Sequence, residues 1–518
     1  MGSFNWRKIT QQLRPSGPPG SVEGDAPAQE GRRSRRALWS IPVLLGLMAA
    51  VTLLWPVQEP VATASAPGDY VVLAWNDLGM HCYNPSFQDL AVLPPYNTLW
   101  AQVIHVGDPP QIVTDGIRVE YFFADNTYSV GKTDFWEYEQ DLFGVDLPPN
   151  VGLTGKGLSG EMDPAGDHFV AEGIPLTEYS DSAPTTRAPY QLATVIVYDA
   201  ATGQELARTQ PVAPVSTEMH CDNCHYDGGV EGIATGRVDT NILTLHDEEN
   251  SDEYPPGHEG LLMDRRPILC AECHASNALG EPGQPGVPSL SKAIHKKHKK
   301  KVPDSLEGCY NCHPGPQTQC LRDVMSTQHG MQCTDCHGGM KQVGDNPNPW
   351  LQEPRCDNGA CHGSDYAQDQ ALFRLSKGHG GVYCAACHDS PHAIAPSNQA
   401  NDAIKFIAMQ GHNGPLDICT VCHATQPTEP GPHGIVVTPV ATASPTATDT
   451  PSPEDTPTPV QTSTPTETPS ITETPGITET PSPTGTPGAT ETPEPTHTPQ
   501  PTGTPEAPLH IYLPSVMR

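Results

Sequence analysis

The sequence is poor in the features that build an ordinary globular protein of its length. Of its 518 residues only 36% are hydrophobic and 6% are aromatic, whereas 58 are proline and 47 are glycine. One large hydrophobic core is therefore not expected, and the length allows two to four domains. Basic residues are also few, 28 Lys and Arg against 60 Asp and Glu, so no segment offers the basic face that nucleic-acid binding requires.

Long hydrophobic runs are equally scarce. Only residues 37–57 form an uncharged run that is long enough to span a bilayer, and four arginines lie just before it, within residues 32–36. This arrangement predicts a cytoplasmic basic leader over residues 1–36 and an extracytoplasmic location for everything after residue 57. The run is interpreted as an uncleaved membrane anchor. A cleaved signal peptide is the alternative, because small residues suited to a peptidase follow at 62–66.

Residues 69–212 have the pattern of a β-rich domain. Runs of β-branched and aromatic residues at 70–75, 101–104, 117–122 and 193–198 are bounded by Gly, Pro and Asp, and a turn at 199–204 leads into a partner strand at 205–208. We expect an antiparallel, β-sandwich-like fold. An irregular region of helix and coil is expected for residues 213–434, which hold little periodicity.

The end of the chain differs in composition from the rest. Residues 435–508 are rich in Thr and Pro, and proline recurs at every sixth position from Pro445 to Pro505 with one exception. Such a tract cannot form a core, so a disordered, extended stalk is expected, followed by a short apolar tag over residues 509–518.

Fourteen of the sixteen cysteines form seven pairs, each followed directly by a histidine. They are numbered here in chain order: motif 1 (Cys221, Cys224, His225), motif 2 (Cys270, Cys273, His274), motif 3 (Cys309, Cys312, His313), motif 4 (Cys333, Cys336, His337), motif 5 (Cys356, Cys361, His362), motif 6 (Cys384, Cys387, His388) and motif 7 (Cys419, Cys422, His423). Six have the spacing C-x-x-C-H, and motif 5 has C-x-x-x-x-C-H.

This pattern is the attachment signature of c-type haem, in which two thiols bond the porphyrin and the adjacent imidazole binds the iron. A zinc half-site or a redox dithiol explains paired cysteines but not the histidine after every pair. The sequence therefore predicts seven covalent haems, with motif 5 as the least secure. Seven haems within residues 213–434 leave little polypeptide between them, so they are expected to lie close together.

A second axial ligand decides between electron transfer and ligand binding, because two imidazoles fill the iron's coordination. Eight further histidines lie in suitable contexts, more than the seven needed, and His220 and His258 are weaker reserves. The eight candidates are His246, His295, His298, His329, His379, His392, His412 and His433.

Residues 293–298, which contain His295 and His298, resemble the paired distal histidines of class III cytochromes c. That resemblance implies that the two imidazoles serve different haems. Five lysines adjoin them within residues 296–301. They form a solvated face, or they neutralise haem propionates or bind an acidic partner.

The wider region 213–434 is similar to secreted multihaem c-type cytochromes. This resemblance rests on motif 6 with its following Pro-His-Ala, on Gln-Gly-His before motif 7, and on Gly-Pro-His-Gly at 431–434. It implies electron transfer but no particular substrate.

Two cysteines, Cys82 and Cys320, belong to no motif. In an oxidising compartment they either form a disulfide between the two regions or remain isolated thiols. Met80, His81 and Cys82 also gather soft-metal donors in one short segment, although a Gly-containing loop with a partly buried thiol explains them equally.

The leading hypothesis is a membrane-anchored or secreted multihaem cytochrome that passes electrons to an extracytoplasmic redox partner or terminal acceptor. A multihaem reductase of nitrogen or sulfur oxyanions is one alternative, although it needs a haem with an open face and the sequence has no C-x-x-C-K site. A conductive, filament-forming cytochrome is the other. No catalytic residue is predicted.

Overall fold

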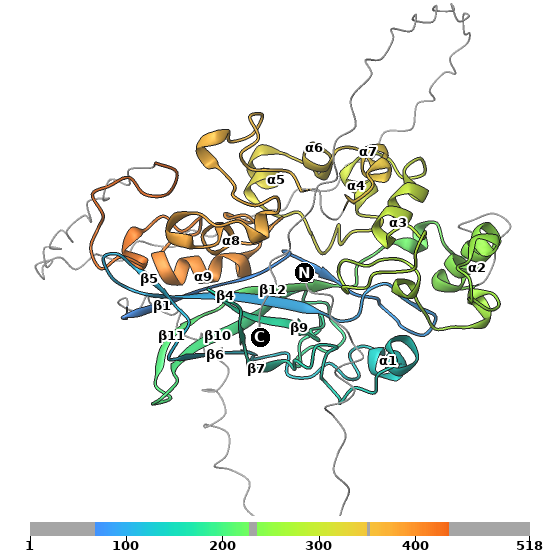
Figure 1. Ribbon diagram of the computed structural model, residues 1–518, viewed down its shortest axis with the longest axis horizontal. Helices are drawn as coiled ribbons and strands as arrows, with labels where there is room; N and C mark the ends of the chain where they lie inside the picture. Colours follow the sequence, from blue (N-terminus) through green and yellow to red (C-terminus); the bar gives the residue numbers. More distant parts are fainter. Residues whose placement is uncertain (1–67, 227–235, 350–352, 435–518) are drawn as a thin grey trace, which may run out of the picture. The chain divides into compact units, whose positions relative to one another are not determined.

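The computed structural model describes residues 68–226, 236–349 and 353–434 (Figure 1). The chain divides into two compact units, Met1–Pro439 and Val440–Arg518, and every described residue belongs to the first. The predicted basic leader, apolar run, stalk and terminal tag lie outside the described residues. Within the described ranges, no helix has both the length and the apolar character to cross a membrane.

The first part of the described chain consists mainly of β-strands. They are β1 (Tyr70–Asn76), β2 (His81–Cys82), β3 (Leu90–Ala91), β4 (Asn97–His105), β5 (Gln111–Val113), β6 (Ile117–Phe123), β7 (Ser159–Glu161), β8 (Asp163–Pro164), β9 (Phe169–Ile174), β10 (Tyr190–Asp199), β11 (Glu205–Thr209) and β12 (Val212–Ser216), with β13 (Ile268–Leu269) further along. One sheet has the order β1-β4-β9-β8 with β5 beside β4, and the other has the order β2-β12-β10-β6-β7 with β11 beside β10.

The four predicted strands coincide with β1, β4, β6 and β10, and the predicted turn leads into β11. The prediction that this region is β-rich is therefore confirmed. Most neighbours pair antiparallel, as expected. The short pairs β2–β12 and β3–β13 are parallel. Both join segments that are far apart in the sequence, where no hairpin dictates an antiparallel direction.

Both sheets contribute to one hydrophobic core. Val72 and Ala74 of β1 point into it together with Val195 and Val197 of β10, and all are almost fully buried. The opposite face of β1 carries Trp75, which is buried in a second cluster with residues of the motif 6 helix. Because both faces of β1 are covered, its sequence is a continuous apolar run instead of an alternating one.

Short helices and coil make up most of the described residues after 216, as predicted. The helices of the described residues are α1 (Phe135–Phe143), α2 (Val238–Asn250), α3 (Leu290–His298), α4 (Leu306–Cys309), α5 (Val324–His329), α6 (Cys333–His337), α7 (Met340–Asp345), α8 (Cys384–His388) and α9 (Ala400–Gln410). In Figure 1, α2 to α9 lie along one side of the sheets, from the green α2 at one end to the orange α8 and α9 at the other.

Local signals set the ends of these helices. The Ser289 hydroxyl accepts a hydrogen bond from the amide of Lys292 at the start of α3, and Asp323 does the same for Ser326 at the start of α5. Helix α9 ends at Gly411, whose φ of 86° lies in the left-handed region that glycine adopts without strain.

Buried ion pairs connect the helical region with the sheets. Arg322 donates two hydrogen bonds to Asp402, at 2.7 and 3.1 Å, and a third to the carbonyl of Gly79 at 2.9 Å. Lys405 pairs with Asp389 at 2.8 Å and donates to a carbonyl of β1. Because removing one partner leaves a buried charge without compensation, such contacts fix the helical region against the sheets.

Candidate functional site

Each C-x-x-C-H motif occupies about one helical turn. In motifs 1, 2, 3 and 7 the amide of the histidine donates to the carbonyl of the first cysteine at 2.9–3.0 Å. A turn of this kind brings residues i, i+3 and i+4 to one side of the backbone. Both sulfurs and the imidazole of a motif can therefore reach one planar group.

Six motif histidines face a second histidine from elsewhere in the chain. The pairs are His225 with His298, His274 with His246, His313 with His295, His337 with His392, His388 with His433, and His423 with His379, and their ring centroids are 6.1–6.2 Å apart. All six second members are among the eight histidines that the sequence singles out.

This spacing fits two imidazoles that share one metal ion. With metal–nitrogen bonds of about 2.0 Å, and about 1.1 Å from each nitrogen to its ring centre, two opposed rings have centres about 6.2 Å apart. All six observed centroid distances, 6.1–6.2 Å, agree with this value. The residues present therefore fit a bis-histidine haem at each of these six motifs.

In six of these rings Nδ1 has a polar partner within the protein. In His274, His295 and His298 the Nδ1 atom lies 2.7–2.8 Å from a backbone carbonyl, which only accepts, so Nδ1 carries the proton and Nε2 keeps a lone pair. In three further rings Nδ1 has a side-chain partner: Asn241 for His225 at 3.1 Å, Tyr254 for His246 at 3.2 Å and Asp108 for His423 at 3.4 Å. Such contacts orient a metal-binding imidazole.

Burial keeps several of these imidazoles neutral. It lowers the pKa of His313 to about 4, with His295 and His337 adding to the effect. It also lowers the pKa of His388 and of His392 to about 4, again with help from neighbouring histidines. A neutral imidazole is the form that binds a metal, so these side chains are ready to bind at neutral pH.

Comparison with family models, with curated proteins and with solved structures found no significant match for this chain. Its function is therefore inferred from its own residues. Nowhere in the described ranges do three or more His, Cys, Asp or Glu side chains converge on one point. A haem iron takes only two protein ligands, because the porphyrin supplies four, so that observation does not bear on the six pairs.

Motif 5 differs from the other six. Among the described residues no histidine ring lies at this spacing from His362, and its ring contact is with Tyr366 at 5.5 Å. Two of the eight candidates, His329 and His412, do not face any motif histidine. His329 is an exposed residue at the end of α5, and Nε2 of His412 lies 3.1 Å from Asp417.

Neighbouring motifs contact one another, beginning with motifs 2, 1 and 3. Helix α2 joins motifs 2 and 1, because its Asn241 hydrogen-bonds the motif 1 histidine while its His246 faces motif 2. Motif 1 contacts motif 3 through Asn223, whose side chain donates to Asn311 at 2.6 Å. Helix α3 spans the same two motifs, since its two histidines face one each.

The contacts continue through motifs 4 and 5. Cys333 in motif 4 lies close enough to Cys309 in motif 3 to lower the pKa of the Cys309 thiol to about 7. Burial, followed by the charges of Asp323 and of Cys361 in motif 5, raises the pKa of Cys336 in motif 4. Motif 5 therefore lies next to motif 4.

Motifs 5, 6 and 7 complete the series. The Tyr366 ring lies 5.5 Å from the motif 5 histidine and 4.9 Å from His433, which faces motif 6. Burial, followed by Cys422 of motif 7, raises the pKa of Cys387 in motif 6 to about 12. The seven motifs thus form one row in the order 2-1-3-4-5-6-7, an order that the sequence does not give.

The lysines of α3 and the residues after it divide into two groups. Lys297 and Lys299 form ion pairs with Glu249 and Asp345. Lys296, Lys300 and Lys301 are exposed, and no acidic side chain of the described residues pairs with them. The first group is structural, and the second leaves positive charge at the surface beside motifs 1 and 3.

The remaining polar candidates do not form a metal site. His81 is hydrogen-bonded to Asp77 at 2.9 Å. Cys82 and Cys320 are both thiols, and burial raises the pKa of each, with the nearby Cys320 adding to the effect on Cys82. The two weaker ligand candidates also have polar partners: His220 contacts Glu218 at 3.2 Å, and His258 contacts an arginine.

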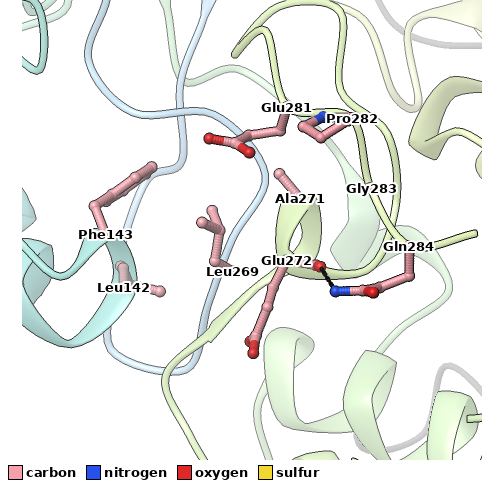
Figure 2. Close-up of a pocket in the computed structure, with 9 residues that line it drawn as sticks. All are labelled: Leu142, Phe143, Leu269, Ala271, Glu272, Glu281, Pro282, Gly283 and Gln284. Carbon is pink, nitrogen blue, oxygen red and sulfur yellow. Dashed lines mark hydrogen bonds between the residues drawn. The ribbon is translucent and has the colours of Figure 1, made fainter. Parts of the chain in front are cut away.

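One cavity, of about 420 Å³, adjoins motif 2. Figure 2 shows Leu142 and Phe143 of α1 on one side of it and Glu272, from between the two motif cysteines, on the other. The carbonyl of Glu272 accepts a hydrogen bond from Gln284 at 3.3 Å. No histidine lines the cavity, so it adds no metal ligand to the motif.

Proposed function

We propose that the chain is a c-type cytochrome with seven covalently attached haems, which passes electrons along a single row of closely spaced centres. The observation that carries this proposal is the set of six imidazole pairs with ring centroids 6.1–6.2 Å apart, each with one member next to a cysteine pair. A structural zinc site does not account for it, because zinc draws four ligands to one point.

The side chains of each motif have distinct roles in this proposal. The two thiols would hold the haem covalently, and the adjacent and facing imidazoles would bind its iron. When bound, the haem supplies a one-electron redox centre. The carbonyls and side chains that accept from Nδ1 keep each ring in place and make Nε2 a stronger donor.

The order of the row determines where electrons enter and leave. Motifs 2 and 7 are its ends, because each contacts only one other motif through the side chains described above. At motif 7 the carbonyl of Cys422 accepts from the amide of Gly107, which follows β4. We expect redox partners or a terminal acceptor to approach these two ends.

The proposed location is extracytoplasmic. Haem attachment to cysteine pairs takes place outside the cytoplasm, and the Arg-flanked apolar run at residues 37–57 supplies either an anchor or a signal for export. The Thr/Pro-rich tract then serves as a spacer between this unit and the end of the chain.

Mass spectrometry of the denatured, acid-extracted chain tests the proposal. The intact mass should exceed that of the polypeptide by seven haems, and replacing both cysteines of motif 6 by alanine should remove one of them. Cys320→Ala is the matched control, because this buried cysteine belongs to no motif and its loss should leave the count at seven. A chain without covalent haem contradicts the proposal.

A further inference from the structure

Motif 5 lies inside the row, between motifs 4 and 6, yet it lacks what the other six have. Its histidine, His362, faces no second imidazole among the described residues, whereas every other motif histidine faces one at 6.1–6.2 Å. The difference sets one centre apart from six that are alike.

The loop of motif 5 is nevertheless well ordered by its own contacts. The guanidinium of Arg355 bonds both oxygens of Asp357, at 2.9 and 2.7 Å, and donates to the carbonyl of Gln370 at 3.0 Å. The amide of Cys356 donates to the side chain of Gln368 at 3.2 Å, and the His362 amide returns to the Cys356 carbonyl at the same distance. A chance pair of cysteines does not need such a framework.

The two histidines left over are not in position to close this centre. His412 has both ring nitrogens engaged, Nδ1 3.2 Å from the carbonyl of Gln410 and Nε2 3.1 Å from Asp417. His329 ends α5 with an exposed side chain, and its ring contacts no motif histidine of the described residues. Neither of these two histidines is therefore in position to supply a ligand to motif 5.

Tyr366 is the aromatic residue nearest to His362. Its ring lies 5.5 Å away, tilted by 56°, and is 38% exposed. A ring in this position borders the centre without replacing an imidazole, and its hydroxyl can act as a hydrogen-bond donor to a small molecule.

We propose that motif 5 is a ligand-binding centre, whose iron keeps its sixth position open for a small external molecule with a lone pair, such as carbon monoxide or nitric oxide. This inference rests on the proposed seven-haem function and concerns binding alone. On this proposal the chain is an electron-transfer row with one ligand-binding site within it, which electrons can reach from either end of the row.

Carbon monoxide is the probe. In the full, haem-loaded chain, reduction followed by carbon monoxide should convert one haem in seven, and the ferric protein should show one high-spin centre. Cys356→Ala with Cys361→Ala should lower the haem count by one and abolish the binding. His379→Ala is the matched positive control: it removes the facing imidazole of motif 7 and should raise the stoichiometry from one to two.

The other outcomes are also decisive. Seven haems that are all low-spin and bind no carbon monoxide overturn the open site but leave the proposed function standing, whereas a chain without haem overturns both. If the wild type binds none and His329→Ala, His412→Ala or Tyr366→Phe binds one equivalent, the replaced residue is the sixth ligand and the inference is wrong. Binding that survives loss of the motif 5 cysteines places the open centre elsewhere.

Discussion

The two regions of the described chain are held together by different means. Of the 47 apolar residues that are buried in the described ranges, 32 lie within residues 72–215, and 15 lie within residues 243–421, of which six are alanine. The β-rich region therefore packs a core of its own side chains. The helical region has too few large apolar residues for one, and its paired histidines are half-buried or exposed.

Because of this difference, the two regions gain stability on folding in different ways. Burying an apolar side chain stabilises by roughly 1.5–3 kcal/mol, and the β-rich region gains this many times over. The helical region instead brings neutral imidazoles together in pairs, which gives little stability until a metal binds between them. We infer that the proposed haems would complete the core of the helical region, as metals do in other domains with few apolar residues.

The strongest test of the comparison is to withhold the haems. A full chain with alanine at all fourteen motif cysteines should lose ordered structure in the helical region while the sheets persist, because the large apolar core lies between the sheets and the helical region has only small apolar clusters. Hydrogen exchange should show protected amides in β1, β4 and β10 and fast exchange in α2, α3 and α8. Equal protection of both regions in the cysteine-free chain contradicts the comparison.

The next largest effect is expected where the regions meet. Arg322→Met leaves the Asp402 carboxylate buried without its charged partner, since the two side chains are 0% and 2% exposed, although the Ser397 hydroxyl still donates to it. Removing one member of such a pair costs about 3–5 kcal/mol, measured by denaturant unfolding of the haem-loaded protein. The double variant Arg322→Met with Asp402→Leu is the control, and it should recover most of the loss. If the single and double variants are equally unstable, the cost comes from packing and not from the lone charge.

A smaller effect involves Asp239 in the first turn of α2. Burial, followed by the charge of Asp89, raises its pKa to about 6 from 3.8. The folded chain therefore holds this proton at a pH where the unfolded chain has lost it, and stability falls as the pH rises from about 4 to about 6. Asp239→Asn should stabilise the protein at pH 7 by about 1–3 kcal/mol and have little effect at pH 4. A stabilisation that does not depend on pH would trace to helix propensity instead.

The sequence predicts local features well and long-range ones poorly. The strands at β1, β4, β6 and β10 follow from β-branched runs and turn residues, which act over a few neighbours. The parallel pair β3–β13 joins residues 90–91 to 268–269, and no local signal indicates it. The predicted leader and stalk fall outside the described residues, and the haem and membrane predictions remain predictions.

The same limit applies to the site. The motif cysteines and histidines are recognisable because attachment requires one spacing along the chain. The facing histidine is subject to no such rule: His246 precedes the motif that it faces, and His298 lies beyond motif 2 although it faces motif 1. Only the folded chain shows which of eight candidates face a motif, and that motif 5 has none.

The smallest expected effect concerns a single centre, that of motif 1. His298 faces His225 at 6.1 Å, and its Nδ1 donates to the carbonyl of Ile294 at 2.8 Å, so its Nε2 is free to bind. A thioether stabilises ferric iron less than an imidazole does, so His298→Met should raise the potential of one haem by on the order of 0.1 V, within the range of about 0.8 V that axial ligands span. His298→Ala should add one carbon-monoxide-binding, high-spin centre to those of the wild type.

The lysines beside His298 provide the control for this prediction. Lys300 is exposed and has no acidic partner among the described residues, so Lys300→Gln changes the surface charge next to motif 1 without altering an iron ligand. It should leave the spin state unchanged and weaken association with an acidic redox partner by less than about 1 kcal/mol, an effect that salt removes. Spectroelectrochemical titration separates the two variants, because only the His298 variants shift one haem out of seven. If His298→Ala contains no more high-spin haem than the wild type, this side chain is not a ligand, and the 6.1 Å pair at motif 1 reflects packing alone.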